Sequence, residues 1–401
     1  MNTISGVSNM MIYEYQGKKY YFFGDYHGTR KGGCHTQGIK CDSFNYDFTD
    51  TTNANTSCTT IGALLHNWFK YNNRQGIKTD FYLEEFYTIT DERVDNQEYI
   101  DSIKNKTNQT QAIFKDKSWM ELLAYIMAPC FLREKKQCPY YPNVHLHYID
   151  IRSVNTLNGV VELTPFSMDI VYDYIQTNQP ITIEELIILR DDVMYYIQFI
   201  IKNYKNMIKF LLSTEGLNAY NDLINIESPI MINNISLLST NNVFKVAKEL
   251  KKLFYVNKEI HDYLINFTYL MANQIDIKIK NYETKIEESL KKYNTMKNRN
   301  LLKTRGLRRG YVDLLDIIKG YDVIFLDMKS ILMDVYTIAR MFIQDGDEII
   351  VFAGVNHIIN YDWFFNYLVD PILKIDYQPG VSCLKNDDIA VYINSDLYKK
   401  N

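Results

Sequence analysis

The chain has 401 residues, 46% hydrophobic and 23% charged, which is the composition of an ordinary globular protein with room for two or three folding units. Its formal net charge of −4 provides no general cationic field to attract nucleic acid or an anionic membrane. We therefore expect a small-molecule or peptide substrate and no nucleic-acid partner.

The sequence also predicts a cellular compartment. No window reaches the roughly 18 uninterrupted apolar residues of a membrane span, and the first residues lack the pattern of a secretory signal. The six cysteines, at 34, 41, 58, 130, 138 and 383, lack the dense spacing of a small secreted disulfide scaffold, so we expect free thiols in a reducing compartment. The 33 tyrosines, with abundant Asn, Ile and Lys, suggest an AT-rich genome such as that of a large DNA virus. We expect an intracellular protein, in the cytoplasm of a host cell or within a virion.

The N-terminal third alternates strand-like and helical patterns. Segments that begin at Thr59 and Ser118 carry apolar residues at helical spacing, and each opens with a residue suited to cap a helix. Runs of β-branched and aromatic residues predict four strands, the first two joined by a Gln-Gly-Lys turn, at 10–15, 19–24, 79–85 and 144–151. This alternation predicts a layered α/β fold.

The rest of the chain divides into a helical part and a second α/β part. Residues 165–310 carry long helical patterns with almost no strand signal, and they end in a basic stretch that we interpret as a solvated helix end and loop. After Gly310 we expect helices at 311–319, 330–344 and 361–373, and strands at 321–328, 347–354 and 388–393. We predict one central mixed sheet built from residues 1–164 and 311–401 and flanked by helices, with 165–310 as an insertion.

Polar residues collect where the predicted strands end, which is where open α/β sheets bind ligands. Four strand ends carry ionisable groups suited to acid–base or metal chemistry: Asp25 with His27, Glu84 with Glu85, Asp150 with Arg152, and Asn356 with His357. His27 lies between two glycines, which permit a tight turn and close approach of a ligand. Taken alone, either histidine has a structural interpretation as well as a functional one.

Glu84 and Glu85 are adjacent, so in a strand only one of them points to a shared site, and we prefer Glu84. Arg340 lies in a helix that is otherwise apolar along one stripe, where a surface arginine is an equally good interpretation.

Four short motifs together resemble a known family. "FFGDYHGTR" at 22–30, "FYLEE" at 81–85, "IARMF" at 338–342 and "VFAGVNHI" at 351–358 resemble, in that order, the motifs of the erythromycin esterase, ChaN, TraB and TIKI superfamily. In that family the first and last thirds of the chain form the active centre on an α/β sheet, and a variable helical region interrupts the sheet. The resemblance covers about half of the chain and leaves out 165–310.

The resemblance implies a hydrolase of ester or peptide bonds, with Asp25 standing where the esterases usually have Glu. The catalytic candidates are His27, Glu84, Glu85, Arg340, His357 and Asp25, and the substrate-binding candidates are Asp150, Arg152, Arg30 and Asn356. In TIKI-like members the same constellation suits a divalent metal such as Mn, Co or Zn, which His27, Glu84 and His357 would hold here. A histidine accepts a proton near neutral pH, a carboxylate orients it, and an arginine holds a developing oxyanion.

Three other interpretations remain open. The sequence "GDYHG" with "GVNH" is similar to parts of a calcineurin-like metallophosphoesterase, although that family's second aspartate motif does not follow. Cys34, His35, Cys41 and Cys58 offer four zinc ligands, but without a paired Cys-x-x-Cys spacing. A catalytically inactive virion or interaction protein would use the segments 181–215 and 240–298 as a partner surface, including for a homo-oligomer.

Overall fold

A computed structural model describes two compact units. The sheet unit comprises residues 1–151 and 340–401, and the helical unit comprises residues 152–339. The expected insertion at 165–310 lies inside the helical unit, which continues further because one helix runs on past residue 310. The residues that the structure describes are 3–26, 34, 58–86, 120, 123, 137–138, 141–151, 198, 201–202, 204–206, 208–213, 240–298, 304–376, 383–385 and 392–393.

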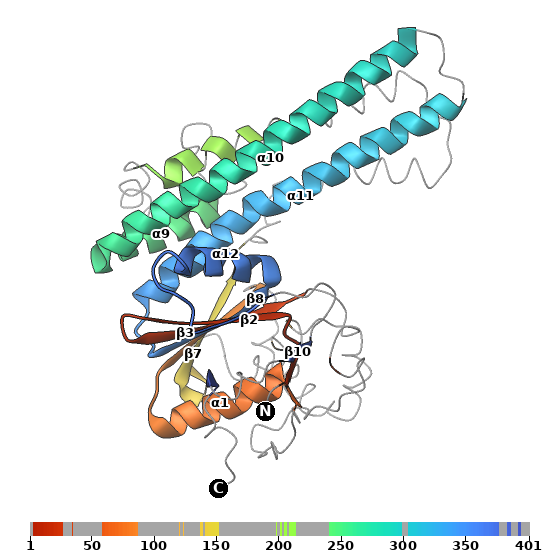
Figure 1. Cartoon of the computed structure of the whole chain (residues 1–401). Helices are drawn as coiled ribbons and strands as arrows, with labels where there is room; N and C mark the ends of the chain where they lie inside the picture. The colour runs from red at the N-terminus through yellow and green to blue at the C-terminus, as the bar shows by residue number, and fades with distance from the viewer. Residues whose placement is uncertain are drawn as a thin grey trace, which may run out of the picture. The chain divides into compact units, whose positions relative to one another are not determined.

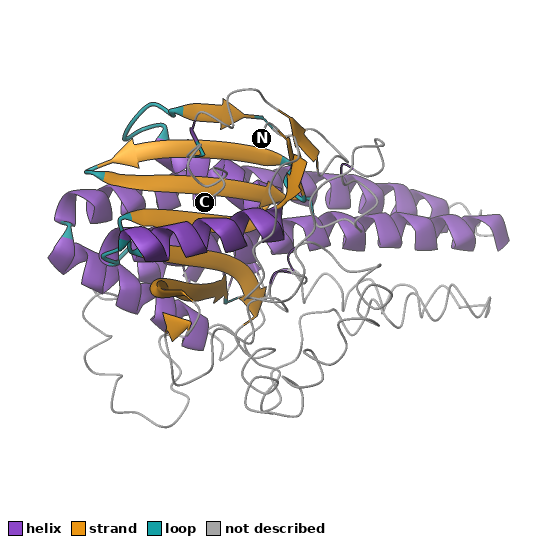
Figure 2. Ribbon diagram, turned by 90° about the horizontal axis from the view of Figure 1, so that it is seen from below, coloured by secondary structure: helices purple, strands orange, loops and turns teal. Residues whose placement is uncertain are grey.

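The sheet unit is built on a seven-stranded mixed sheet in the order β6-β7-β5-β8-β3-β2-β9. Figure 2 draws the strands as orange arrows. Its central strands β7, β5, β8 and β3 are parallel, whereas β6, β2 and β9 pair antiparallel. The strands are β2 (Asn9–Tyr15), β3 (Lys18–Asp25), β5 (Thr79–Phe86), β6 (Gln137–Cys138), β7 (Tyr141–Asp150), β8 (Glu348–Gly354) and β9 (Leu373–Ile375). The predicted α/β fold, with one mixed sheet built from both ends of the chain, is confirmed, because β8 lies between β5 and β3.

Helices cover both faces of this sheet, so side chains on both faces of its central strands are largely buried. These strands are therefore rich in apolar residues. On one face Tyr21 and Phe23 of β3 pack with Trp68 of α1 (Ile61–Gln75), whose ring lies 4.5 Å from that of Tyr21. On the other face lies α12 (Val355–Phe365) (Figure 1). Its Phe365 contacts Phe22, with ring centroids 5.1 Å apart. The aromatic run of β3 is therefore the centre of the core, with alternate side chains on opposite faces.

Local sequence signals were sufficient to predict the first helix and the β2–β3 hairpin. Thr60 caps α1, since its hydroxyl accepts a hydrogen bond from the Ala63 N–H at 3.3 Å, and Gly76 ends the helix at φ 71°. The β2–β3 turn places Gln16 and Gly17 at φ 52° and 77°, the left-handed conformation that a tight hairpin needs. These elements form where the sequence predicts them because their determinants are local.

The predicted strand at 321–328 is wrong. These residues lie inside α11 (Thr304–Ile343), one continuous helix that also includes the two predicted flanking helices. Its buried residues Ile324, Met328 and Ile331 recur at spacings of three and four, whereas Val323 and Leu326 are more than half exposed. The run "VIFL" is apolar throughout, and so short a run does not distinguish a strand from a helix.

The C-terminal elements also differ from the prediction. Helix α12 begins directly at Val355, six residues before the predicted start at 361, and the chain forms the short strand β9 where the predicted helix would end. Of the predicted strand at 388–393, residues 388–391 lie outside the described residues, and Tyr392 and Ile393 are not in a strand. The early start of α12 matters, because it puts the "GVNH" motif in the first turn of a helix.

The helical unit contains α9 (Thr240–Val256), α10 (Lys258–Asn298) and most of α11. Asn257 separates the first two helices and caps the second, because its side-chain oxygen accepts a hydrogen bond from the Ile260 N–H at 3.1 Å. Helices α10 and α11 lie side by side and antiparallel (Figures 1 and 2), and Lys278 pairs with Asp327 at 2.5 Å. No helix in the described part of the chain has the length and apolar composition needed to span a membrane.

A second, smaller sheet brings together three distant segments. Strands β10 (Cys383–Lys385), β1 (Thr3–Ser5) and β4 (Cys58–Thr60) pair in that order, and each has only three residues. Cys34 and Cys383 form a disulfide beside this sheet across 349 positions of sequence, and Cys58, packed against them, is also disulfide-bonded. So small a sheet needs such support.

The expectation of free thiols is therefore wrong at these positions. Cys34 and Cys58 also cannot serve as thiolate ligands for zinc, while His35 and Cys41 of that hypothetical site lie outside the described residues. Disulfides persist mainly in oxidising compartments, so the reducing compartment expected from the cysteine spacing loses its support.

Removing the long-range disulfide should destabilise the sheet unit. We expect the double variant Cys34→Ala and Cys383→Ala to lose about 2–4 kcal/mol of unfolding free energy, because the cross-link restricts the unfolded chain. Denaturant unfolding without reductant measures the loss, and peptide mapping of the non-reduced protein should recover the two cysteines in one linked peptide. Alkylation of both thiols in the native protein, with unchanged unfolding of the variant, would contradict the disulfide.

Candidate active site at the strand ends

The position of β8 in the sheet decides where the candidate residues meet. Asp25, the last residue of β3, is in register with Gly354, the last residue of β8, and Leu83 of β5 is in register with Phe352. Because these three strands are parallel, their carboxyl ends lie at one edge of the sheet. Asp25, Glu84 and the segment that follows Gly354 therefore share this edge.

Glu84 and His357 form a buried pair at this edge. His357 lies in the first turn of α12, and its Nε2 is 3.3 Å from Oε1 of Glu84, with both side chains at most 4% exposed. The other oxygen of Glu84 accepts a hydrogen bond from the Gly354 N–H. Gly354 has no side chain to cap α12, so the carboxylate supplies the negative charge that a helix N-terminus favours.

The structure places Glu84 as preferred from the sequence, for a reason that the sequence does not show. The pairing of β5 with β7 shifts register between Leu83 and Phe86, which is a bulge or similar irregularity. Such irregularities re-aim side chains at strand ends. The backbone of Glu85 belongs to β5, but its side chain lies outside the described residues.

Gly24 is needed for the close approach of α12 to β3. A Cβ atom at this position would lie 1.7 Å from Oδ1 of Asn9 and 3.3 Å from Cα of Val355. A side chain there would displace the buried Asn9 or the first residue of α12, and so move His357. The glycine of the "GDYHG" motif thus has a packing role.

Asp25 is fully buried, and neither oxygen of its carboxyl group makes a hydrogen bond of ordinary geometry with a described residue, although the backbone N–H of Met120 lies near enough to act on its charge. Burial, together with the nearby charge of Glu84, raises its pKa to about 7, although the backbone N–H of Met120 opposes this shift. A carboxyl group of this kind exchanges a proton near neutral pH, as an acid–base catalyst must.

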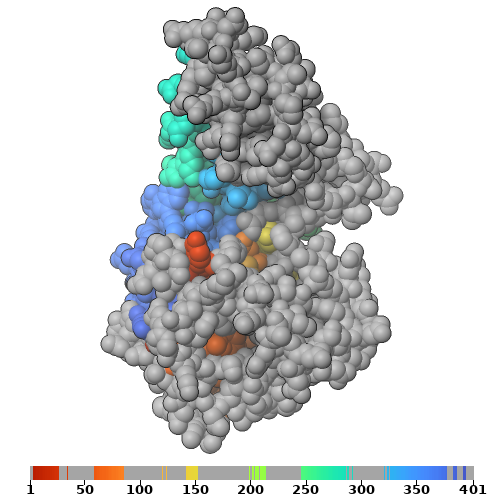
Figure 3. Space-filling view, turned by 90° about the vertical axis from the view of Figure 1, so that its right-hand side faces the viewer, coloured from red at the N-terminus to blue at the C-terminus, as the bar shows by residue number. Residues whose placement is uncertain are grey.

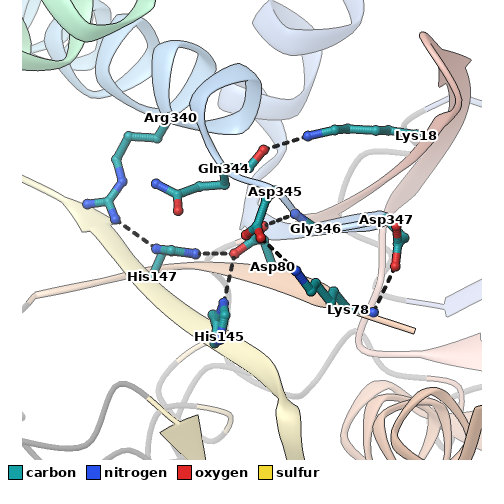
Figure 4. A network of polar contacts seen from close by, with 10 residues as sticks. All are labelled: Lys18, Lys78, Asp80, His145, His147, Arg340, Gln344, Asp345, Gly346 and Asp347. Carbon is teal, nitrogen blue, oxygen red and sulfur yellow. Dashed lines mark hydrogen bonds and ion pairs between the residues drawn. The ribbon is translucent and has the colours of Figure 1, made fainter. Parts of the chain in front are cut away.

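Arg340 belongs to a different group of polar side chains. Its Nη2 donates to Nδ1 of His147 at 2.8 Å, and Nε2 of His147 lies 2.7 Å from Oδ1 of Asp80 (Figure 4). Asp80 lies four residues before Glu84 on β5, which separates their Cα atoms by about 13 Å. Among the described contacts, Glu84 meets His357, whereas Arg340 meets His147. His27, the fourth expected member of the centre, lies outside the described residues.

The remaining candidates have varied positions. Asp150 ends β7 and is buried, and Asn356 is exposed in the first turn of α12. His27, Arg30 and Arg152 lie outside the described residues. Within the part of the chain that the structure describes, no three His, Cys, Asp or Glu side chains are arranged as a metal site.

Comparisons with models of known protein families, with curated proteins and with solved structures found no match. The resemblance to the erythromycin esterase, ChaN, TraB and TIKI superfamily therefore stays a prediction that rests on the four motifs.

Sequence reasoning missed Asp80 and His147, which are buried polar residues inside the sheet. A signal was present in "VHLHY", where histidines alternate with apolar residues along a strand, and in the single acidic residue near the start of "TDFYLEE". The parallel register that places His145 beside Asp80 and His147 beside Tyr82 was needed to connect them.

The buried carboxyl group of Asp25 should make stability depend on pH. Its folded pKa of about 7 lies above the ordinary value of 3.8, so the folded protein keeps a proton that the unfolded chain releases between these values. The unfolding free energy should therefore fall as pH rises from about 4 to 7. Asp25→Asn, which does not titrate, should gain stability relative to wild type over this range, by about 2–4 kcal/mol in total.

Denaturant unfolding of wild type and Asp25→Asn at several pH values between 4 and 8 measures this dependence. Asp376→Asn is a suitable control, because it removes a negative charge from a side chain that is 83% exposed. A constant difference between Asp25→Asn and wild type at every pH would refute the predicted titration.

Proposed function

We propose that this protein is a hydrolase of ester or peptide bonds, with an acid–base centre formed by Glu84, His357 and Asp25 at the carboxyl ends of β5, β8 and β3. The observation that carries the proposal is the contact of His357 with Glu84, two residues far apart in the sequence and both buried. The pair lies at the edge where α/β sheets bind ligands, and buried ionisable pairs are frequent at functional sites.

The pair suits the activation of water. A neutral imidazole accepts a proton from water as it attacks an acyl carbon, and a carboxylate on the ring stabilises the imidazolium that forms. Glu84 is itself held by the Gly354 N–H, so it fixes the orientation of the imidazole. In the next step the histidine returns the proton to the leaving group.

Asp25 supplies a second group that exchanges protons at the same edge. Its pKa of about 7 leaves a large protonated fraction near neutral pH, which allows it to donate a proton or a hydrogen bond to a substrate oxygen. The two carboxyl groups thus differ in role: Glu84 contacts a backbone N–H and a histidine, whereas the pKa of Asp25 is raised mainly by burial.

The family resemblance also implies a divalent metal. The described residues of this edge do not form a three-ligand set, and His27, the further candidate ligand, lies outside them. We therefore derive the reaction from the protein's own acid–base groups, and we treat Mn, Co and Zn as conditions to be tested.

The full-length protein should be assayed against acyl esters of graded chain length and a fluorogenic peptide library, with added Mn, Co or Zn and with chelator. We expect hydrolysis of at least one substrate class, and a fall in kcat/KM of about 10²–10⁴-fold in His357→Ala and Glu84→Gln. Ile359→Ala is the matched control on α12, since this side chain is exposed and only two residues from His357. Circular dichroism and thermal unfolding confirm that each variant is folded.

Unchanged hydrolysis in folded His357→Ala and Glu84→Gln would place the activity elsewhere. Absence of hydrolysis under every metal condition would favour an interaction protein on the same fold.

One observation supports the alternative of an interaction protein: α10 exposes Tyr269, Leu270 and Ile277, which are apolar side chains at helical spacing. Figure 3 shows residues of α10, coloured green, at the surface of the molecule. Sedimentation analysis would show whether the helical unit joins two copies of the chain.

A further inference from the structure

The geometry around His147 fixes this histidine in one neutral form. The guanidinium group of Arg340 can only donate hydrogen bonds, so Nδ1 of His147 must accept from it through a lone pair. The proton of the neutral ring is then on Nε2, which donates to Oδ1 of Asp80 at 2.7 Å. The ring stacks on Tyr82, with centroids 4.5 Å apart, and is 9% exposed.

The charged and titratable groups that face His147 come from three elements. Asp80 of β5 attracts a charged imidazole, whereas Arg340 of α11 and His145 of β7 oppose it (Figure 4). Burial is the largest cause and lowers the pKa of His147, and the bond to Asp80 only partly compensates. The ring therefore takes up its second proton in the acidic range, below the usual pKa of histidine.

The same network holds the segment through which the chain returns to the sheet unit. Arg340 is the first residue of that unit after the helical unit and lies in the last turn of α11. The other oxygen of Asp80 accepts a hydrogen bond from the Gly346 N–H at 2.9 Å, in the loop between α11 and β8. A Cβ at Gly346 would lie 2.4 Å from this oxygen, so the loop packs directly on the carboxylate.

We propose that the Asp80–His147–Arg340 network is an acid-sensitive switch that holds the last turn of α11 on the sheet at neutral pH and releases it when His147 is protonated. The switch does not depend on hydrolase activity, because none of its three members belongs to the Glu84–His357 pair.

Protonation would reverse the contact with Arg340. The second proton goes to Nδ1, which then carries an N–H that faces the N–H donors of the guanidinium, and two positive charges lie at hydrogen-bonding distance. Asp80 stays paired with the imidazolium, so Arg340 is the group that leaves. Its departure loosens the last turn of α11, which keeps apolar contacts, such as that of Phe342 with Tyr20, and the hydrogen bond from Lys18 to the Gln344 carbonyl.

Hydrogen exchange of the full-length protein between pH 7.5 and 5.0, corrected for the intrinsic pH dependence of exchange, tests this proposal. In wild type, amide protection of residues 340–344 should fall on acidification, because protonation of His147 removes the contact that holds Arg340. His147→Gln should keep its protection, because an amide can donate to Asp80 and accept from Arg340 but does not titrate. His145→Gln is the matched control, since this histidine also lies near Asp80, with Nδ1 at 3.7 Å from Oδ1, and is 31% exposed.

An acid-dependent loss of protection in wild type and His145→Gln, and not in His147→Gln, would support the switch. Equal loss in His147→Gln, or none in wild type, would overturn it. Should His147→Gln fail to fold, Arg340→Gln gives a second test, because without the cation the acid-dependent loss should shrink. Undiminished loss in Arg340→Gln would also overturn the switch.

Discussion

Two buried carboxylates of β5 hold the two ends of β8, and the arrangement of the sheet unit depends on them. Asp80 accepts a hydrogen bond from the N–H of Gly346, just before β8 begins, and Glu84 accepts one from the N–H of Gly354, where β8 ends. Leaving a buried carboxylate without such donors would cost several kcal/mol of folding free energy. Each carboxylate therefore fixes the position of the N–H group that it binds, and the N–H group fixes the carboxylate. The strand from the C-terminal part of the chain is thus located by polar contacts as well as by its ladder with β3 and β5.

Each of these carboxylates also holds a histidine, and the two histidines suit different purposes. His147 lies between Asp80 and the cation of Arg340, which occupies its second nitrogen, so this ring has no free position for a substrate. His357 contacts Glu84 at the edge where α12 begins, next to the buried carboxyl group of Asp25 on the neighbouring strand. Both ends of β5 thus carry a carboxylate–histidine pair. The Asp80–His147 pair attaches the end of α11 to the sheet, and the Glu84–His357 pair is the proposed catalytic pair.

The outer parts of the sheet unit are stabilised in another way. The three-residue strands β10, β1 and β4 come from distant segments and bury little surface of their own. The disulfide ties Cys383 of β10 to Cys34, whose backbone N–H donates to Ser5 of β1. A cross-link over so many residues restricts the unfolded chain strongly, and that compensates for a sheet too small to be stable alone. Disulfide bonds of this kind also bear on where the protein can fold.

The sequence by itself determined the α/β class, the hairpin of β2 and β3, helix α1 with its Thr60 cap, and the helical character of the middle of the chain, because side-chain periodicity and local caps specify these elements. It also singled out Asp25, Glu84 and His357 as residues at strand ends. Only the tertiary structure decided that Glu84 meets His357, that Arg340 meets His147 and that Cys34 meets Cys383, since each contact joins residues that the order of strands brings together. The helix at 321–328 was likewise decided by burial, because a short run that is apolar throughout fits a strand as well as a helix until its packing partners are known.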